Sequence, residues 1–187
     1  MKAKPDRHGP NRFSSYQEIH RTVLDQFKSR DFIGTETLEF NPVPNGFLLK
    51  GEISCLGEIV IAVEKFLDIH DLLPQPIDDF VVQTTWYSYN AFVRNHSNIL
   101  RYDNQDGDDL RPGHADAHHK HSFDWLTGKE EPGSPFWVGS EGWLTLGEVI
   151  QEVEDWYWAN RKDLPHPDAY PNLNLRGCPP SLEKPLA

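Results

Sequence analysis

The sequence predicts an α+β domain: an antiparallel sheet of about four strands, arranged as a meander, with an N-terminal and a C-terminal helix packed on it. Two amphipathic segments and a β-rich segment between them predict this class. The 187 residues are enough for one domain with its own core. We expect a flexible N-terminal arm at 1–13, a single domain at 14–163 and a proline-rich C-terminal tail at 164–187.

The first helix is expected at about residues 15–29. Ser15 and Glu18 have the spacing of a capping box, in which each side chain accepts a hydrogen bond from the backbone N–H of the other residue. Apolar side chains then recur every three or four positions, which is the repeat of one helix face. They are Tyr16, Ile19, Val23, Leu24 and Phe27.

The strands are expected within residues 46–103. Apolar residues alternate after the turn formed by Asn45 and Gly46, and β-branched and apolar residues fill 57–69 and 79–94. Residues 95–98 are typical of a turn, so the segment that ends at Asp103 should return beside the preceding strand. Short connections between consecutive strands favour antiparallel neighbours, and this predicts the meander.

The last helix is expected from Thr145 to about residue 162, because Thr145 and Glu148 form a second capping box and an apolar face follows. Residues 104–142, between sheet and helix, show no periodicity and contain repeated glycine and proline. A loop of this length inside a compact domain is commonly functional or disordered. The sequence therefore predicts a histidine-rich loop at 104–142.

The composition restricts the classes of partner. With 18 basic and 29 acidic side chains the net charge is −11, which opposes non-specific attraction to polyanions and favours a cationic protein partner. No segment approaches the roughly 20 apolar residues of a membrane-spanning helix. The N-terminus has no apolar signal core. We expect a cytoplasmic protein without a membrane contact. The two cysteines, Cys55 and Cys178, form no CxxC pair, which disfavours a thiolate zinc site.

Four of the nine histidines fall within residues 114–121, and three interpretations of this cluster remain open. The first is general acid–base catalysis, because imidazole exchanges a proton near neutral pH. Two imidazoles can act on either side of an RNA phosphodiester, whose 2′-hydroxyl is the nucleophile. Lys120, Arg101 or Arg111 would then stabilise the developing negative charge.

The second interpretation is a metal site. His114 and His118 are four residues apart, and His118 and His121 are three apart, so these three side chains could bind zinc or another divalent transition metal. Asp116 is available as a carboxylate ligand. The third interpretation is a solvated loop whose histidines have no function. Spacing alone does not choose among the three.

Arg101 and Asp103 form a second candidate pair. They are two residues apart on the expected last strand, so they share one face of the sheet. A structural ion pair is the commoner arrangement for such neighbours. In the functional alternative, Arg101 binds a phosphate with two parallel N–H donors, and Asp103 holds it or a histidine in place.

The order of these motifs resembles the TumE toxin family of bacterial type II toxin–antitoxin systems. The resemblance rests on three runs, followed by a closing helix, within about residues 46–160. The runs are YSY at 87–89, LRYDN at 100–104 and HKH at 119–121. It implies a small toxin that acts as a metal-independent endoribonuclease without a cofactor, with RNA as its substrate and a cognate antitoxin protein as its partner.

The same resemblance implies roles for five residues. His119 and His121 would be the proton-transfer pair, Lys120 or Arg101 the phosphate ligand, and Asp103 an orienting group. The chain departs from the family pattern in its added N-terminal helix, its acidic charge, an insertion at 105–113 and its tail. These departures leave two alternatives open: a non-catalytic binding or regulatory module, and a histidine-coordinated metal-dependent hydrolase. Homo-oligomer formation also stays open.

Overall fold

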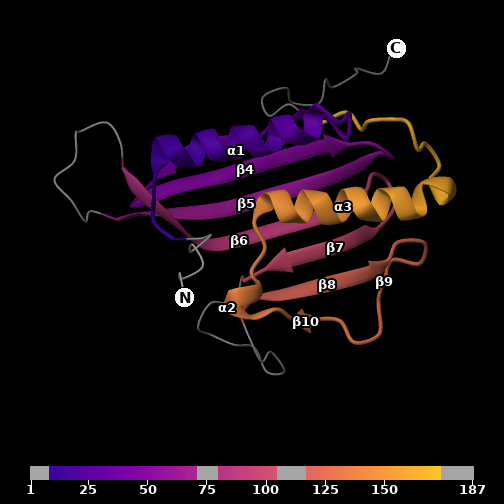
Figure 1. Ribbon diagram of the computed structural model, residues 1–187. Coiled ribbons are helices and arrows are strands. Elements are labelled where there is room, and N and C mark those ends of the chain that lie inside the picture. Colours follow the sequence, from indigo (N-terminus) through magenta and orange to yellow (C-terminus); the bar gives the residue numbers. More distant parts are fainter. Residues whose placement is uncertain (1–8, 71–79, 105–116, 174–187) are drawn as a thin grey trace, which may run out of the picture.

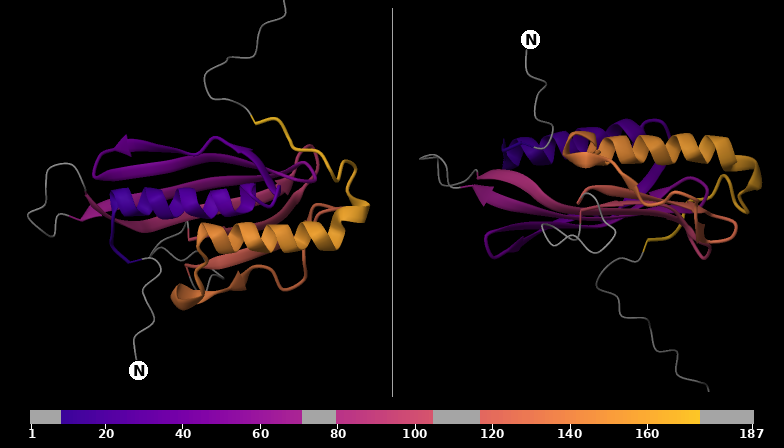
Figure 2. Two further views of the ribbon diagram at one scale, coloured as in Figure 1. Left: turned by 45° about the horizontal axis from the view of Figure 1, so that its top comes forward. Right: turned by 90° about the horizontal axis from the view of Figure 1, so that it is seen from below.

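The computed structural model describes residues 9–70, 80–104 and 117–173. In this part of the chain, ten strands form one antiparallel sheet, and two long helices cover one of its faces (Figures 1 and 2). The helices are α1 (Phe13–Lys28) and α3 (Leu146–Asn160). The opposite face carries no helix among the described residues.

Five strands follow one another as a meander: β4 (Gly46–Cys55), β5 (Ile59–His70), β6 (Val81–Val93), β7 (Asn98–Asp103) and β8 (His119–Asp124). Short strands extend it. On one side, β2 (Ile33–Glu36) and β3 (Glu39–Val43) pair with β4. On the other, β9 (Lys129–Glu130) and β10 (Phe136–Trp137) pair with β8, while β1 (Asn11–Arg12) pairs with β6.

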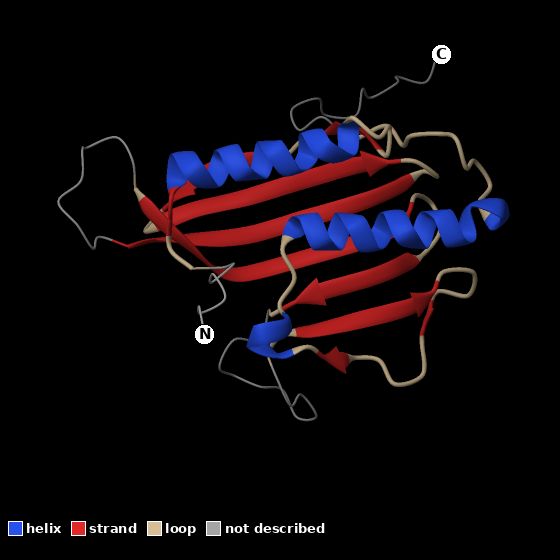
Figure 3. Ribbon diagram, viewed as in Figure 1, coloured by secondary structure: helices blue, strands red, loops and turns tan. Residues whose placement is uncertain are grey.

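The prediction of about four strands is wrong, because the sheet has ten (Figure 3). The meander of β4 to β7 lies where the sequence placed it. Most of the additional strands have two to five residues, too few for an alternating pattern to be recognised. In β8 the buried positions His119 and His121 are polar, so hydrophobic periodicity does not reveal this strand. The expected loop at 104–142 therefore contains β8, β9, β10 and the short helix α2 (Gly139–Gly142).

The two long helices begin in different ways. Thr145 caps α3 as predicted: its Oγ1 accepts a hydrogen bond from Glu148 N at 3.4 Å, and Glu148 Oε2 accepts one from Thr145 N at 2.8 Å. Helix α1 begins two residues before the expected capping box. Its N-cap is Arg12, which makes no side-chain capping bond, so Ser15 and Glu18 lie inside the helix.

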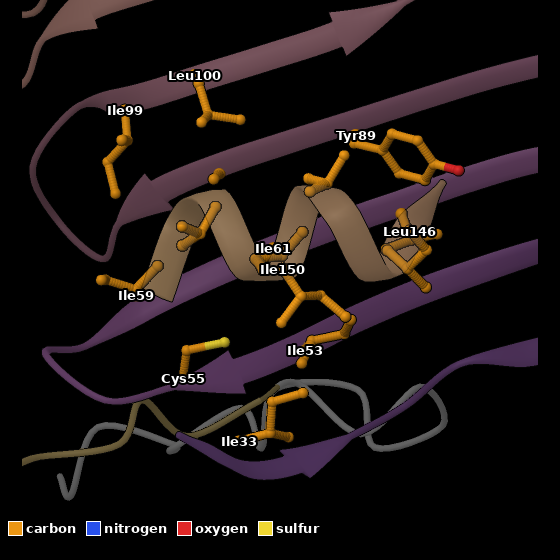
Figure 4. Close-up of a cluster of buried hydrophobic side chains, with 14 of the residues drawn as sticks. Ile33, Ile53, Cys55, Ile59, Ile61, Tyr89, Ile99, Leu100, Leu146 and Ile150 are labelled. Atoms are coloured by element: carbon orange, nitrogen blue, oxygen red, sulfur yellow. The ribbon is translucent and has the colours of Figure 1, made fainter. Parts of the chain in front are cut away.

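The core lies between the sheet and the two helices. Buried aliphatic side chains of β4, β5 and α3, such as Ile53, Ile61 and Ile150, interdigitate there (Figure 4). Residues 164–173, expected to belong to the tail, pack on the domain, and Ser54 Oγ donates a hydrogen bond to Pro171 O at 2.9 Å. Residues 1–8 of the arm and 174–187 of the tail lie outside the described residues. No described helix is long and apolar enough to cross a membrane.

Candidate functional site

The site is built on β7 and β8, which lie side by side. Their register places Arg101 opposite His121 and Asp103 opposite His119. Directly opposed residues on paired strands share a face, so these four side chains gather on one side of the sheet. That side faces away from the helices, because the intervening Tyr102 donates a hydrogen bond from its hydroxyl to Glu152 of α3 at 2.8 Å.

Asp103 and His119 form a buried pair. The distance between His119 Nε2 and Asp103 Oδ1 is 3.0 Å, and both side chains are almost inaccessible to solvent. The other ring nitrogen of His119, Nδ1, lies 2.9 Å from the carbonyl oxygen of Ala117. A carbonyl only accepts, so Nδ1 must carry a proton. Nε2 faces a carboxylate oxygen, so a proton on this nitrogen would be donated to Asp103, away from water.

His121 is held by a carboxylate on one side and a guanidinium on the other. Its Nδ1 donates to Glu130 Oε1 at 2.7 Å, and its Nε2 accepts from Arg101 Nη2 at 3.0 Å. This assigns the neutral imidazole with the proton on Nδ1. Burial lowers the pKa of His121, Arg101 and His119 lower it further, and the contact with Glu130 opposes them. His121 is thus prepared to accept a proton at Nε2.

Arg101 connects the two histidines. Its Nε lies 2.7 Å from Asp103 Oδ2 as an ion pair, although the two atoms are not aligned for a hydrogen bond. The Arg101 side chain is 41% exposed, whereas that of Asp103 is 3% exposed. A buried carboxylate therefore anchors a cation that remains accessible to an anionic ligand.

Aromatic rings border the site. The ring centroid of Trp137 lies 5.8 Å from that of His119, and Phe123 stacks on His121 at 6.3 Å. Trp137, on the edge strand β10, is 38% exposed and pairs in register with His119, so it shares the face of the site, whereas Phe136 pairs with Lys120 on the other face. An exposed ring beside an accessible cation can stack an unpaired base.

A hollow of about 340 Å³ continues the same face of the sheet toward β4 and β5. Its lining includes Ser88 and Asn90, which pair in register with Asp103 and Arg101. Lys50 and Glu64 line its far part and form an ion pair at 3.0 Å. The site is therefore one end of a longer polar surface, as an extended ligand would require.

Two predicted residues lie on the helix-covered face instead. Lys120 pairs with Glu152 of α3 and lies over the ring of Tyr102 at 5.6 Å. His118 stacks on Trp143 with ring centroids 5.0 Å apart, and its Nδ1 lies 3.2 Å from the Tyr87 hydroxyl. The sheet thus separates Lys120 and His118 from the predicted residues on the other face, which are Arg101, Asp103, His119 and His121.

The structure does not bring together the predicted metal ligands His118 and His121, which lie on opposite faces. The third predicted ligand, His114, lies outside the described residues, as do Arg111 and Asp116. A different set converges: ligand atoms of Asp103, His119 and His121 all lie within 4.8 Å of one another. This buried group could hold a metal ion. Its sequence signal is the spacing of two residues on each of two paired strands.

Glu130 is the charged residue of the described site that the sequence analysis did not name. It lies on β9, which reaches His121 only because a turn folds β9 back along β8. No local pattern marks it.

Comparisons of the chain with protein-family models, with curated proteins and with solved structures found no match. The function therefore has to be argued from the geometry.

Proposed function

We propose that this protein is a TumE-like toxin that cleaves RNA as a metal-independent endoribonuclease by histidine general acid–base chemistry. The observation that carries the proposal is the 3.0 Å contact between Arg101 Nη2 and His121 Nε2. It supports the proposal because cleavage by the RNA's own 2′-hydroxyl requires a cation for the phosphate beside a proton acceptor. The proposal includes a cognate antitoxin protein as the partner.

In this proposal each side chain has one role. Arg101 turns from His121 onto the phosphate and stabilises its added negative charge. His121 takes the proton of the 2′-hydroxyl, whose oxygen attacks phosphorus. His119 gives its Nε2 proton to the leaving 5′-oxygen, which takes the place of Asp103 Oδ1 as the partner of this nitrogen. The products are a 2′,3′-cyclic phosphate and a 5′-hydroxyl. Asp103 and Glu130 position the two histidines.

The test is cleavage of single-stranded RNA by the purified full chain, with and without EDTA, beside a His119→Ala/His121→Ala variant whose folding is checked by circular dichroism. We expect cleavage that resists the chelator, leaves 2′,3′-cyclic phosphate ends and disappears in the variant. The matched control is His96→Ala, which removes a histidine of the turn between β6 and β7 that packs edge-on against Trp125. Absence of cleavage, or equal cleavage by wild type and the double variant, would overturn the proposal.

The pH dependence of cleavage is expected to reflect the lowered pKa of His121. A base is active when unprotonated, so kcat/KM should rise with pH and level off below about pH 6.5, the pKa of free imidazole. Glu130→Gln removes a charge that raises this pKa, so the rising limb should move to lower pH. Profiles of kcat/KM against pH for the wild type and for Glu130→Gln measure the position of the rising limb in each protein. A shift to higher pH in Glu130→Gln would contradict the assignment of His121 as base.

Lys120→Met is expected to leave cleavage within about twofold of wild type, because Lys120 faces α3 rather than the site. The variant should lose no more than about 1 kcal/mol of unfolding free energy, since its pair with Glu152 is partly exposed and screened. Steady-state kinetics and urea denaturation measure the two effects. A loss of cleavage without unfolding would restore Lys120 as the phosphate ligand.

A specific observation favours a second candidate, a hydrolase that uses zinc or another divalent transition metal. Both His119 and His121 direct Nδ1 at an oxygen acceptor, which is how metal-ligating histidines are commonly oriented. With Asp103 they form two imidazoles and one carboxylate, a ligand set suited to such metals. Arg101 would have to leave His121 Nε2. This candidate predicts one bound metal per chain, lost in Asp103→Asn, and an activity abolished by EDTA.

A further inference from the structure

A lysine occupies a core position on the face of the sheet that the helices cover. Val63, Lys65 and Leu67 are two residues apart along β5, so all three point toward the helices. Lys65 is only 7% exposed. Its Nζ donates to the phenol oxygen of Tyr16 on α1. Within the part of the chain that the structure describes, no carboxylate forms an ion pair with it. Buried ammonium groups are rarely left without an anion.

Lys65 lies at a cavity of about 170 Å³ between the sheet and the two helices. Besides Lys65, its polar lining comes from Tyr16 and His20 of α1 and Thr84 of β6. Val23 of α1 contributes an apolar wall. The volume is that of roughly six water molecules. The cavity thus combines a buried cation with space for a small, partly apolar molecule.

The start of α3 adds a second electropositive feature. Leu146 and Gly147, its first two residues, line the same cavity. Amides of a first helical turn have no intrahelical acceptor, and the helix dipole is positive at this end. Glu148 caps the backbone N–H of Thr145, not those of the two residues that line the cavity. Tyr89 lies beside Leu146 at this end of the core (Figure 4).

One polar atom of the cavity lining, His20 Nε2, is buried and has no hydrogen-bond partner among the described residues. Burial and the neighbouring Lys65 lower the pKa of His20 to about 4, so its ring is neutral and Nε2 can donate or accept. Burial lowers the pKa of Lys65, but the phenols of Tyr89 and Tyr16 raise it by more, so Lys65 keeps its charge. A charged donor and an unused polar atom therefore meet at one cavity.

We propose that this cavity binds a small carboxylate with a short branched apolar chain. The carboxylate accepts hydrogen bonds from Lys65 and from the first amides of α3, and the chain contacts Ile19 and Val23. The cavity and the Asp103 site lie on opposite faces of the sheet, because Lys65 faces the helices and Asp103 faces away from them. The inference therefore does not depend on the proposed ribonuclease function.

The experiment measures binding of isovalerate to the full chain by calorimetry and by thermal unfolding, with sodium chloride holding ionic strength constant. Isovaleramide has the same shape without the charge. We expect isovalerate to bind and raise Tm, and isovaleramide to bind at least about tenfold more weakly, since a charged hydrogen bond is lost. Equal binding of the two, or no binding of isovalerate, would overturn the proposal.

Two variants locate the binding. Lys65→Met keeps the side-chain volume and removes the charge, so isovalerate affinity should fall at least about tenfold. Val23→Phe fills the cavity from α1 while retaining Lys65, and it should abolish binding even where Lys65→Met does not fold. Lys50→Met is the matched control, because Lys50 pairs with Glu64 on the opposite face. Unchanged affinity in Val23→Phe, or a loss in Lys50→Met equal to that in Lys65→Met, would show that the ligand binds elsewhere.

Discussion

Arg101→Met is expected to lower kcat/KM for RNA cleavage by about 10²–10³-fold, the usual cost of removing one donor that stabilises transition-state charge. Methionine keeps much of the arginine stem but cannot bind phosphate. Arg101→Lys keeps the charge and loses the two parallel donors, so we expect it to recover only part of the rate. Single-turnover kinetics with a defined single-stranded RNA would measure both.

A structural role for Arg101 is separated from a phosphate-binding role by the pH profile. The guanidinium lowers the pKa of His121, so Arg101→Met should also move the rising limb of kcat/KM to higher pH. Simple unfolding would reduce the rate without moving this limb. The matched control is Arg94→Met, because Arg94 is also partly buried and pairs with a carboxylate, Glu52, at 3.5 Å. Equal losses of rate in Arg94→Met and Arg101→Met would contradict phosphate binding by Arg101.

Strand alternation predicted one half of the site, because Arg101 and Asp103 are two residues apart on an expected strand. His119 and His121 were named from the family resemblance, and residues 119–121 were expected to lie in a loop. Arg101 and Asp103 are two residues apart, as are His119 and His121, and two paired strands bring such pairs to one face. The same alternation places Lys120 on the opposite face. The family resemblance alone did not indicate this, because it treats the HKH run at 119–121 as one unit. Lys120 can be placed on the opposite face only when residues 119–124 are recognised as a strand.

In the fold as a whole, the long elements were predicted from the sequence and the short strands were not. Strands β4 to β7 and both long helices have enough residues for their periodicity to be read from the sequence. Strand β8 shows no hydrophobic periodicity, because its buried positions hold His119 and His121. These polar side chains can be buried only because residues on other strands form hydrogen bonds or ion pairs with them. One of these partners, Glu130, comes from β9, and no local pattern identifies a two-residue strand. Two of the unpredicted strands, β8 and β9, therefore complete the site.

Asp103→Ala is expected to cost about 3–5 kcal/mol of unfolding free energy, the range for removing one partner of a buried ion pair. The variant leaves Nε2 of the buried His119 without its partner and removes the anchor of Arg101. Glu130→Ala is the matched control, because it also removes a carboxylate partner of a site histidine. Since Glu130 is 44% exposed, its loss should cost no more than about 1 kcal/mol. Urea denaturation at constant pH would measure both values.

A double-mutant cycle separates the pair from its surroundings. His119→Met replaces the ring with an apolar side chain that can fill the same space. With His119→Met in place, Asp103→Ala should cost at least about 1 kcal/mol less than in the wild-type background, because no buried imidazole proton is then left unpaired. Strictly additive losses would show that Asp103 and His119 do not stabilise each other. The role of the buried pair would then be to position Arg101. In that case Asp103→Ala would lower kcat/KM by more than the loss of folded protein accounts for.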